Sequence, residues 1–179
     1  TTGDHEYFTG RYGKATKENV TQFLSADATN PNSILSCLSA ARENARSVRE
    51  IISSEMWEQV NRFYLIVRDA VSHGLSSRNL HTFLADVKAN SHLFLGITDA
   101  TMSHGEGWHF ARLGRLLERA DKTSRILDVK YFMLLPTVAE VGTPFDIIQW
   151  SAFLQSASAL VLYYKRFCPI SPHDVPAFL

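Results

Sequence analysis

The stretch from Glu106 to Tyr131 constrains the fold more than any other part of the chain. Its apolar and small side chains recur every three or four positions and therefore form one stripe of a long amphipathic helix. The stripe consists of Phe110, Leu113, Leu117, Ala120, Ser124, Leu127 and Tyr131. Four basic side chains fall on roughly the opposite side: Arg112, Arg115, Arg119 and Lys122. The stretch predicts an all-helical domain in which this basic face is the place to look for function.

Turn and cap signals divide the rest of the chain into helices with short connections. No segment alternates convincingly with a period of two, so no strand is expected. Asn30 before Pro31, and Thr143 before Pro144, are typical helix starts. Residues 1–14 show little periodicity, so no helix is expected there. The expected helices cover residues 16–26, about 30–52, about 54–71, about 79–102, 106 to the limit set by Pro136, 144 to about 167, and a last segment after Ser171-Pro172.

These segments predict one domain over residues 1–179, a single antiparallel bundle of about six or seven helices. The chain has 179 residues, of which 45% are hydrophobic, enough for one globular core. Its 18 basic and 18 acidic side chains balance, so no global field attracts nucleic acid or an anionic membrane. Any anion site must therefore be local.

The cysteines and the hydropathy of the chain indicate in which cellular compartment the protein is expected. Cys37 and Cys168 lie far apart with no neighbouring ligand pattern, which indicates reduced thiols, with one incidental disulfide as the alternative. No apolar run approaches the roughly 20 residues that span a bilayer, and no leader opens the chain. A soluble, cytoplasmic protein is expected.

Arginines concentrate on two of the expected helices. Beside the apolar stripe of the second helix, three of them lie about one turn apart, near Glu43. On the fifth helix, acidic and basic side chains alternate at ion-pair spacing, with Glu118 able to reach Arg115 and Lys122. The candidate anion- or partner-binding residues are Arg42, Glu43, Arg46, Arg49, Arg112, Arg115, Glu118 and Arg119.

Three interpretations of these arginines remain open. They form a solvated, ion-paired face, worth only tenths of a kcal/mol per pair. Alternatively, the two rows face one another or a partner and bind an anionic group, for which the planar guanidinium is well suited. In the third interpretation the network is fully paired inside the bundle and inert. Trp108 and Ile126 project on the side of the fifth-helix row, which favours contact over bare solvent.

Four long motifs stand out: Ala41-Arg42-Glu43-Asn44-Ala45-Arg46, Ser54-Glu55-Met56-Trp57, Glu106-Gly107-Trp108 and Glu118-Arg119-Ala120-Asp121. These motifs resemble those of the bacterial alpha-E family, an alpha-helical domain named for a Glu-Arg motif. The resemblance covers nearly the whole chain and implies an all-helical fold. Members occur beside circularly permuted ATP-grasp proteins and transglutaminase-like proteases, which implies an accessory part in making or trimming peptide-like amide bonds.

The chain departs from the family at its start. Full-length members begin with a helix that carries an Arg-Tyr-x-Glu-Arg-Ala motif, which residues 1–14 lack apart from Arg11-Tyr12. The comparison implies that this chain lacks an N-terminal helix. A missing helix would expose part of the core, so a homo-oligomer or swapped bundle is expected to be accessible.

The sequence contains few signals for a metal site or for covalent catalysis. His104, Glu106 and His109 cluster before the fifth helix, but a di-iron site would need a second Glu-x-x-His, so no metal is expected. Cys37 lies on an apolar flank and is expected to be a small buried hydrophobe. The chain has no nucleophile elbow, phosphate loop or dinucleotide motif, and no cofactor is expected. The aromatic residues Trp57, Phe63, Tyr64, Phe83, Phe94 and Trp150 are expected in the core.

Two classes of function follow. The favoured one is a non-catalytic interaction module that docks on an amide-forming or amide-cleaving protein through its Arg/Glu surface. The alternative is an enzyme or substrate-holding subunit, in which the arginines clamp a carboxylate or phosphate while Glu43, Glu106 or Glu118 moves a proton. The catalytic residues stay unassigned. The two classes differ in whether the two arginine rows face each other around a pocket.

Overall fold

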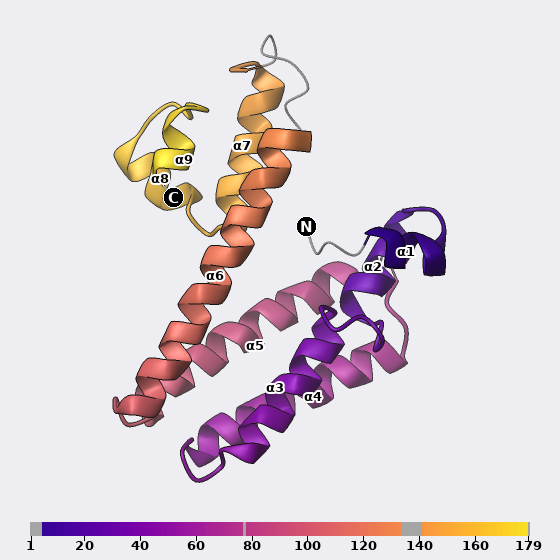
Figure 1. The fold of residues 1–179 in the computed structure, drawn as a ribbon, viewed down its shortest axis with the longest axis vertical. Helices are drawn as coiled ribbons and strands as arrows, with labels where there is room; N and C mark the ends of the chain where they lie inside the picture. Colours follow the sequence, from indigo (N-terminus) through magenta and orange to yellow (C-terminus); the bar gives the residue numbers. More distant parts are fainter. Residues whose placement is uncertain (1–4, 77, 134–140, 179) are drawn as a thin grey trace. The chain divides into compact units, whose positions relative to one another are not determined.

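The computed structural model describes residues 5–76, 78–133 and 141–178 (Figure 1). Within these ranges the regular elements are nine helices and no strand, so the predicted all-helical class is confirmed. No single described helix is long and apolar enough to cross a membrane; only α7 and α8 taken together, bent by 115° at the break between them, pass that test of length and composition. The helices are α1 (His5–Tyr12), α2 (Lys17–Ser25), α3 (Ile34–Ser47), α4 (Ser54–Ser72), α5 (Leu80–Thr101), α6 (Glu106–Met133), α7 (Pro144–Ser156), α8 (Leu160–Arg166) and α9 (Asp174–Phe178).

Several boundaries agree with the local signals. Ser53 caps α4, because its Oγ accepts a hydrogen bond from the backbone N–H of Met56 at 3.1 Å. Thr143 caps α7 in the same way, with Pro144 as the first helical residue. Helix α5 lies between Asn79 and Met102, as expected. The expected end of α6 at Pro136 falls outside the described residues.

Helix α3 begins later than predicted. The amide of Asn30 is buried in the preceding loop, where its Nδ2 donates to the carbonyl of Phe23 at 2.8 Å. Its Oδ1 accepts from the N–H of Asn32 at 3.0 Å. The Asn30 side chain therefore holds the loop, and the cap is Ser33, whose Oγ accepts from the N–H of Ser36 at 3.1 Å.

The predicted helix over 144–167 is divided into α7 and α8. Ser158 adopts a left-handed backbone conformation, with φ of 57°. The N–H of Ser158 donates to the carbonyl of Gln155 at 3.1 Å, and the N–H of Ala159 donates to that of Leu154 at 2.8 Å. These bonds terminate α7 in the manner usual for a C-terminal glycine. No glycine or proline marks this position, so the sequence carries no stop signal here.

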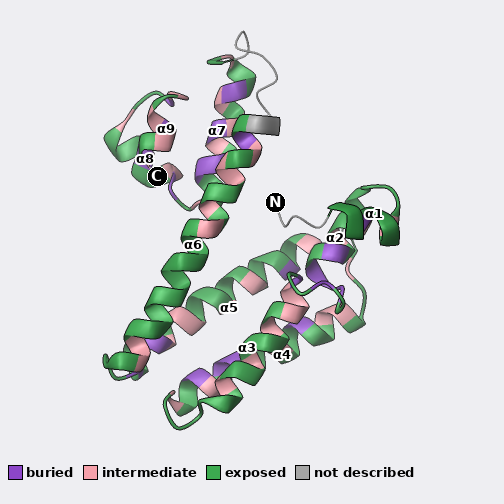
Figure 2. Cartoon of the chain, viewed as in Figure 1, coloured by how far each residue is buried: buried purple, intermediate pink, exposed green. Residues whose placement is uncertain are grey.

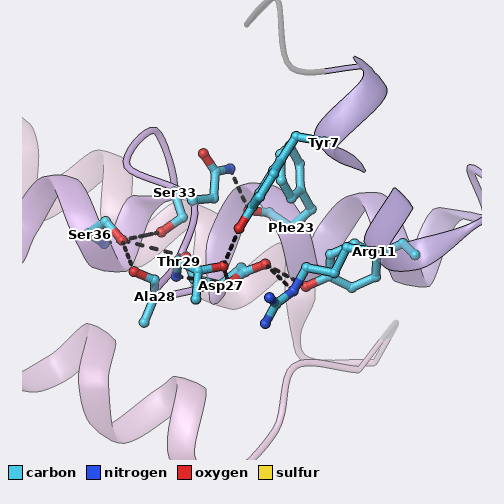
Figure 3. Close-up of polar contacts among 10 residues, drawn as sticks. Tyr7, Arg11, Phe23, Asp27, Ala28, Thr29, Ser33 and Ser36 are labelled. Atoms are coloured by element: carbon cyan, nitrogen blue, oxygen red, sulfur yellow. Dashed lines mark hydrogen bonds and ion pairs between the residues drawn. The ribbon is translucent and has the colours of Figure 1, made fainter. Parts of the chain in front are cut away.

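Helix α1 lies in a region for which no helix was expected. It is attached by the buried carboxylate of Asp27, which follows α2 (Figure 3). Asp27 accepts from the hydroxyl of Tyr12 at 2.9 Å and from Nε of Arg11 at 3.2 Å. It also accepts from the N–H and the hydroxyl of Thr29, at 2.9 and 2.7 Å. The Tyr7 hydroxyl reaches Thr29 at 2.7 Å. Tertiary contacts thus hold a short helix whose own sequence pattern is weak.

The charge of Asp27 is favoured in spite of its burial. Loss of water is the largest single effect and raises the pKa of this carboxyl. The two hydrogen bonds from Thr29, the one from Tyr12 and the charge of Arg11 together outweigh it. The pKa of Asp27 consequently lies below its ordinary value.

The chain divides into two compact units, residues 2–110 and residues 111–179. In the first unit α4 packs against both α3 and α5, and the core contains Phe63, Val67 and Phe83. In the second unit the core contains Trp150, Leu154 and Tyr163, among others. Each unit has its own hydrophobic core, so the prediction of one bundle over residues 1–179 stays a prediction.

Helix α6 packs through only the C-terminal part of its predicted apolar stripe. Phe110, Leu113 and Leu117 are 64%, 51% and 62% exposed. Figure 2 shows exposure along most of this helix, with buried and half-buried positions toward its end. There, Ile126 and Leu127 pack against the core that includes α7. Because α7 lies along only the C-terminal half of α6 (Figure 1), that half alone is covered within this unit.

Candidate functional site

Arg42 on α3 is attached firmly to α4. Its Nε donates to Oδ1 of Asn61 at 2.7 Å. Its guanidinium lies over the ring of Trp57, at 5.9 Å from the centroid, and over that of Tyr64, at 5.3 Å. The side chain is 33% exposed. Stacking and hydrogen bonding therefore use most of this guanidinium to join two helices.

The stacking continues on both sides of Arg42. Arg49 lies over Trp57 at 4.7 Å, and Arg68 lies over Tyr64 at 5.7 Å. Three guanidinium groups and two aromatic rings thus alternate along the surface of α3 and α4. Trp57 and Tyr64, which were expected in the core, are only half-buried. The available signal was the seven-residue spacing of Arg42 and Arg49, matched by that of Trp57 and Tyr64.

Glu43 and Arg46 complete the α3 row on its solvent side. Glu43 pairs with Arg42 at 3.4 Å and with Arg46 at 3.6 Å. The side chains of Glu43 and Arg46 are 53% and 69% exposed. Ion pairs at this exposure contribute little to stability.

We expect replacement of Arg42 by lysine to lower the free energy of unfolding by about 1 kcal/mol. Lysine keeps the charge but loses the planar group that stacks on two rings and reaches Asn61. Urea denaturation followed by circular dichroism measures the change. The matched control is Arg46→Lys on the same helix, which should stay within about 0.5 kcal/mol. Equal effects of the two substitutions would contradict the anchoring role of Arg42.

The α6 row is paired along its own helix. Oε1 of Glu118 lies 3.2 Å from Nζ of Lys122, which also approaches Asp121 at 3.4 Å. Asp121 accepts from Nε of Arg125 at 2.8 Å, as its spacing predicted. The hydrogen bond with Glu118 is the main cause of a raised pKa for Lys122, and the bond from Arg125 is the main cause of a lowered pKa for Asp121. Both groups therefore stay charged near neutral pH.

Arg119 leaves this surface row and reaches the end of α7. Its Nη2 donates to the carbonyl of Ala157 at 3.4 Å. Beside it, α6 and the turn after α7 enclose an open pocket of about 280 Å³. Arg119 and Lys122 line the pocket on the α6 side, and Ser158 lines it on the turn side. Arg115 and Arg112, about one and two turns before Arg119 on α6, are exposed.

A buried ionic centre lies further along the same face of α6, and sequence reasoning missed it. Nζ of Lys130 donates to Oδ1 of Asp146 at 2.5 Å and to Oε1 of Gln149 at 2.7 Å. The side chains of Lys130 and Asp146 are 3% and 2% exposed. The ammonium also lies 5.1 Å from the ring centroid of Trp150, and Oδ2 of Asp146 accepts from the N–H of Gly142 at 2.9 Å. The sequence signal for this residue was its helical spacing, because Lys130 lies on the same face of the helix as Arg119, Lys122 and Ile126.

The two predicted rows belong to different compact units. Arg42, Glu43, Arg46 and Arg49 lie in residues 2–110, whereas Arg112, Arg115, Glu118 and Arg119 lie in residues 111–179. The contacts described above for Arg42, Glu43, Arg46 and Arg49, and those for Glu118 and Arg119, lie inside the respective unit. The prediction that the rows face one another stays a prediction.

Two further predicted features have a clear location. Cys37 is exposed, so the expectation of a buried cysteine is wrong; its helix face lies outside the packed side of α3, and its Sγ donates to the carbonyl of Pro31 at 3.6 Å. Cys168 is exposed as well, and both thiols are free. His104 stacks on Trp108 with ring centroids 4.4 Å apart. In the described parts of the chain, no three His, Cys, Asp or Glu side chains group closely enough to hold a metal ion.

The comparisons with known proteins include a match to a family model. No curated protein and no solved structure matches the chain. The family that matches, named Alpha-E, is described as "a predicted alpha-helical domain with a conserved ER motif" and matches residues 1–179. The sequence contains a single Glu-Arg dipeptide, Glu118-Arg119, which places the motif beside the pocket at the end of α7. With its helical fold and this motif, the chain belongs to the Alpha-E family.

Proposed function

We propose that this chain is a non-catalytic accessory domain in a bacterial, cytoplasmic system that forms or cleaves peptide-like amide bonds. Its partners would be an ATP-grasp-type ligase or a transglutaminase-like protease, as the family resemblance implies. Formation of homo-oligomers is part of the same proposal. Recognition of nucleic acid and of a membrane surface is not part of it, since the chain carries no net charge.

The observation that carries this proposal is the exposed surface of α6. Leu113, Leu116 and Leu117 are 51%, 49% and 62% exposed. Single exposed leucines are ordinary, but three within five residues of one helix form a local apolar patch. Arg112 and Arg115 flank the patch, and arginines beside an apolar centre are typical of protein interfaces. A matching partner presents carboxylates around an apolar surface.

The state of the carboxylates supports a non-catalytic role. A general base must be available to take a proton. Glu118 is engaged with Lys122, and Glu43 with Arg42 and Arg46. The described pKa shifts on α6 favour the charged state of ion pairs and raise no carboxyl toward neutral pH.

The proposal is tested by binding of the chain to the ATP-grasp-type protein and to the transglutaminase-like protease encoded beside it, measured by biolayer interferometry. We expect the double variant Leu113→Glu, Leu117→Glu to weaken binding at least tenfold, because it places charge in the apolar patch. The matched control is Val161→Glu on α8, a residue that is 68% exposed and should leave binding unchanged. Binding that survives the double variant would refute the α6 surface, and no binding to either protein would refute the accessory role.

The pocket beside Arg119 favours a second candidate, a subunit that holds an anionic substrate group. Two cationic side chains, Arg119 and Lys122, meet there in a concave site. Concavity with a few placed polar groups is typical of small-molecule sites. This candidate requires no catalytic residue in the chain itself.

A further inference from the structure

The pocket at the end of α7 combines an apolar floor with a cationic wall. Ile126 and Phe153 supply the apolar side, and both belong to the packed core of this unit or its edge. Lys122 and Thr123 lie about one turn after Arg119 on α6, and all three line one wall. The cations therefore stand on a rigid element and not on a loop.

Each cation is oriented by a neighbour and keeps donors to spare. Arg119 uses one of its five N–H donors on the carbonyl of Ala157. Lys122 is held by Glu118 at 3.2 Å and by Asp121 at 3.4 Å, which occupies two of its three donors. These contacts fix the direction of both side chains before any ligand arrives, which lowers the entropic cost of binding.

The stretch of α6 that supplies Arg119 and Lys122 is positive although the whole chain is neutral. Between Arg112 and Arg125, helix α6 carries five basic and two acidic side chains, an excess of three positive charges. A ligand with more than one negative charge matches this excess better than a single carboxylate does.

The opposite wall contains Ser158 in an unusual conformation. Its φ of 57° lies in the left-handed region, and among the described residues no other non-glycine side chain has a positive φ. This position ends α7, where glycine is the ordinary residue because it carries no steric penalty. A serine here keeps a hydroxyl at the pocket at a cost in stability, and such strain is common at functional sites.

From these four observations we propose that the pocket binds the phosphate group of a small organic phosphate monoester. The three terminal oxygens of a phosphate point in different directions and can accept from α6 on one side and from Ser158 on the other. The guanidinium of Arg119 matches two of these oxygens with parallel N–H donors. Since the pocket of about 280 Å³ is larger than a phosphate group, the organic portion lies against Ile126 and Phe153. The inference rests on the second candidate function and is independent of the accessory role.

The test uses the full chain and phenyl phosphate, a monoester with a small apolar portion, in calorimetric titrations. Inorganic phosphate and benzoate are the comparison ligands. We expect phenyl phosphate to bind at least tenfold more tightly than either of them. Arg119→Gln and Lys122→Gln should each weaken it at least tenfold. Lys165→Gln on α8 removes one charge from the same unit without lining the pocket, and should leave the affinity unchanged.

Ser158→Gly separates a binding role from a structural one. Glycine relieves the left-handed strain, so we expect the thermal midpoint to rise. Loss of the hydroxyl should at the same time weaken phenyl phosphate binding. A rise in stability with unchanged affinity would overturn the role of Ser158 in the site.

The remaining outcomes distinguish the phosphate assignment from the more general anion-holding function. If benzoate binds as tightly as phenyl phosphate and Arg119→Gln abolishes both, the phosphate assignment fails while the anion-holding function stands. If neither ligand binds at millimolar concentration, both fail. An equal loss in Lys165→Gln and in Arg119→Gln would show general charge attraction and overturn the site.

Discussion

Replacing Lys130 by methionine is expected to lower the free energy of unfolding of residues 111–179 by about 3–5 kcal/mol. Lys130 and Asp146 are both almost completely buried, and each is the charged partner of the other. Methionine has a similar length but cannot neutralise the carboxylate. Asp146 would still accept from the N–H of Gly142 but would keep a buried charge without its cationic partner. Gln149 would lose the ammonium that donates to its side-chain oxygen.

Tryptophan fluorescence during urea denaturation measures this loss, because Trp150 lies beside the ammonium. The chain has three tryptophans, so a background with Trp57→Phe and Trp108→Phe leaves Trp150 as the only reporter. Methionine in that background should shift the transition to lower urea.

A double variant decides whether the buried charge is the cause. Lys130→Met with Asp146→Asn removes both charges while retaining an oxygen for the N–H of Gly142. Most of the lost stability should return, because replacing both members of a buried ion pair costs far less than removing one. A loss below about 1 kcal/mol in the single variant, as for a surface pair, would contradict the burial of this ion pair.

Replacing Asp27 by asparagine is expected to destabilise the first unit by about 2–3 kcal/mol at neutral pH. The carboxylate receives hydrogen bonds from Tyr12 and Thr29 and lies against Arg11. Asparagine keeps the shape but accepts through a single neutral oxygen. Helix α1 depends on this group for its attachment, so its helical signal in circular dichroism should decrease as well. The exposed carboxyl of Asp86 provides the control Asp86→Asn, expected to change stability by less than about 0.5 kcal/mol.

The same residue gives the protein a specific response to acid. The pKa of Asp27 is lowered in the folded state, so folding favours its deprotonated form. The associated stability is fully present above the ordinary Asp pKa of about 4 and disappears as the pH falls through the lowered folded value. Other carboxyls titrate in this range too, so the informative quantity is the difference in unfolding free energy between the native chain and Asp27→Asn. This difference should shrink below about pH 4; a constant difference down to pH 2 would refute the contribution of the Asp27 charge.

Helix positions were largely predictable from local sequence. The caps at Ser53 and Thr143 and the break around Gly105 involve hydrogen bonds and backbone preferences within a few residues. The errors had two causes, a side chain engaged outside its own helix and a backbone conformation without its usual residue. Asn30 donates to the carbonyl of Phe23 in α2 and does not cap α3. Ser158 ends α7 without a glycine.

The composition of the candidate site was also predictable in part. The α6 ion pairs follow from spacing, because residues three and four apart are neighbours on any helix. The Glu-Arg motif was identified from sequence strings, and the family match over residues 1–179 confirms the family. Neither the spacing nor the motif indicates that Arg119 contacts the turn after α7.

Sequence alone therefore determined most of the helical segments and which residues share a face, since both depend on interactions within a few positions. Only the tertiary structure decided which face is covered. It packs Ile126 and Lys130 of α6 against α7 while Leu113 and Leu117 remain exposed, and it places Arg42 between two rings of α4. The reason is physical: burial requires a partner surface from a distant part of the chain, and helix periodicity carries no information about where that partner lies.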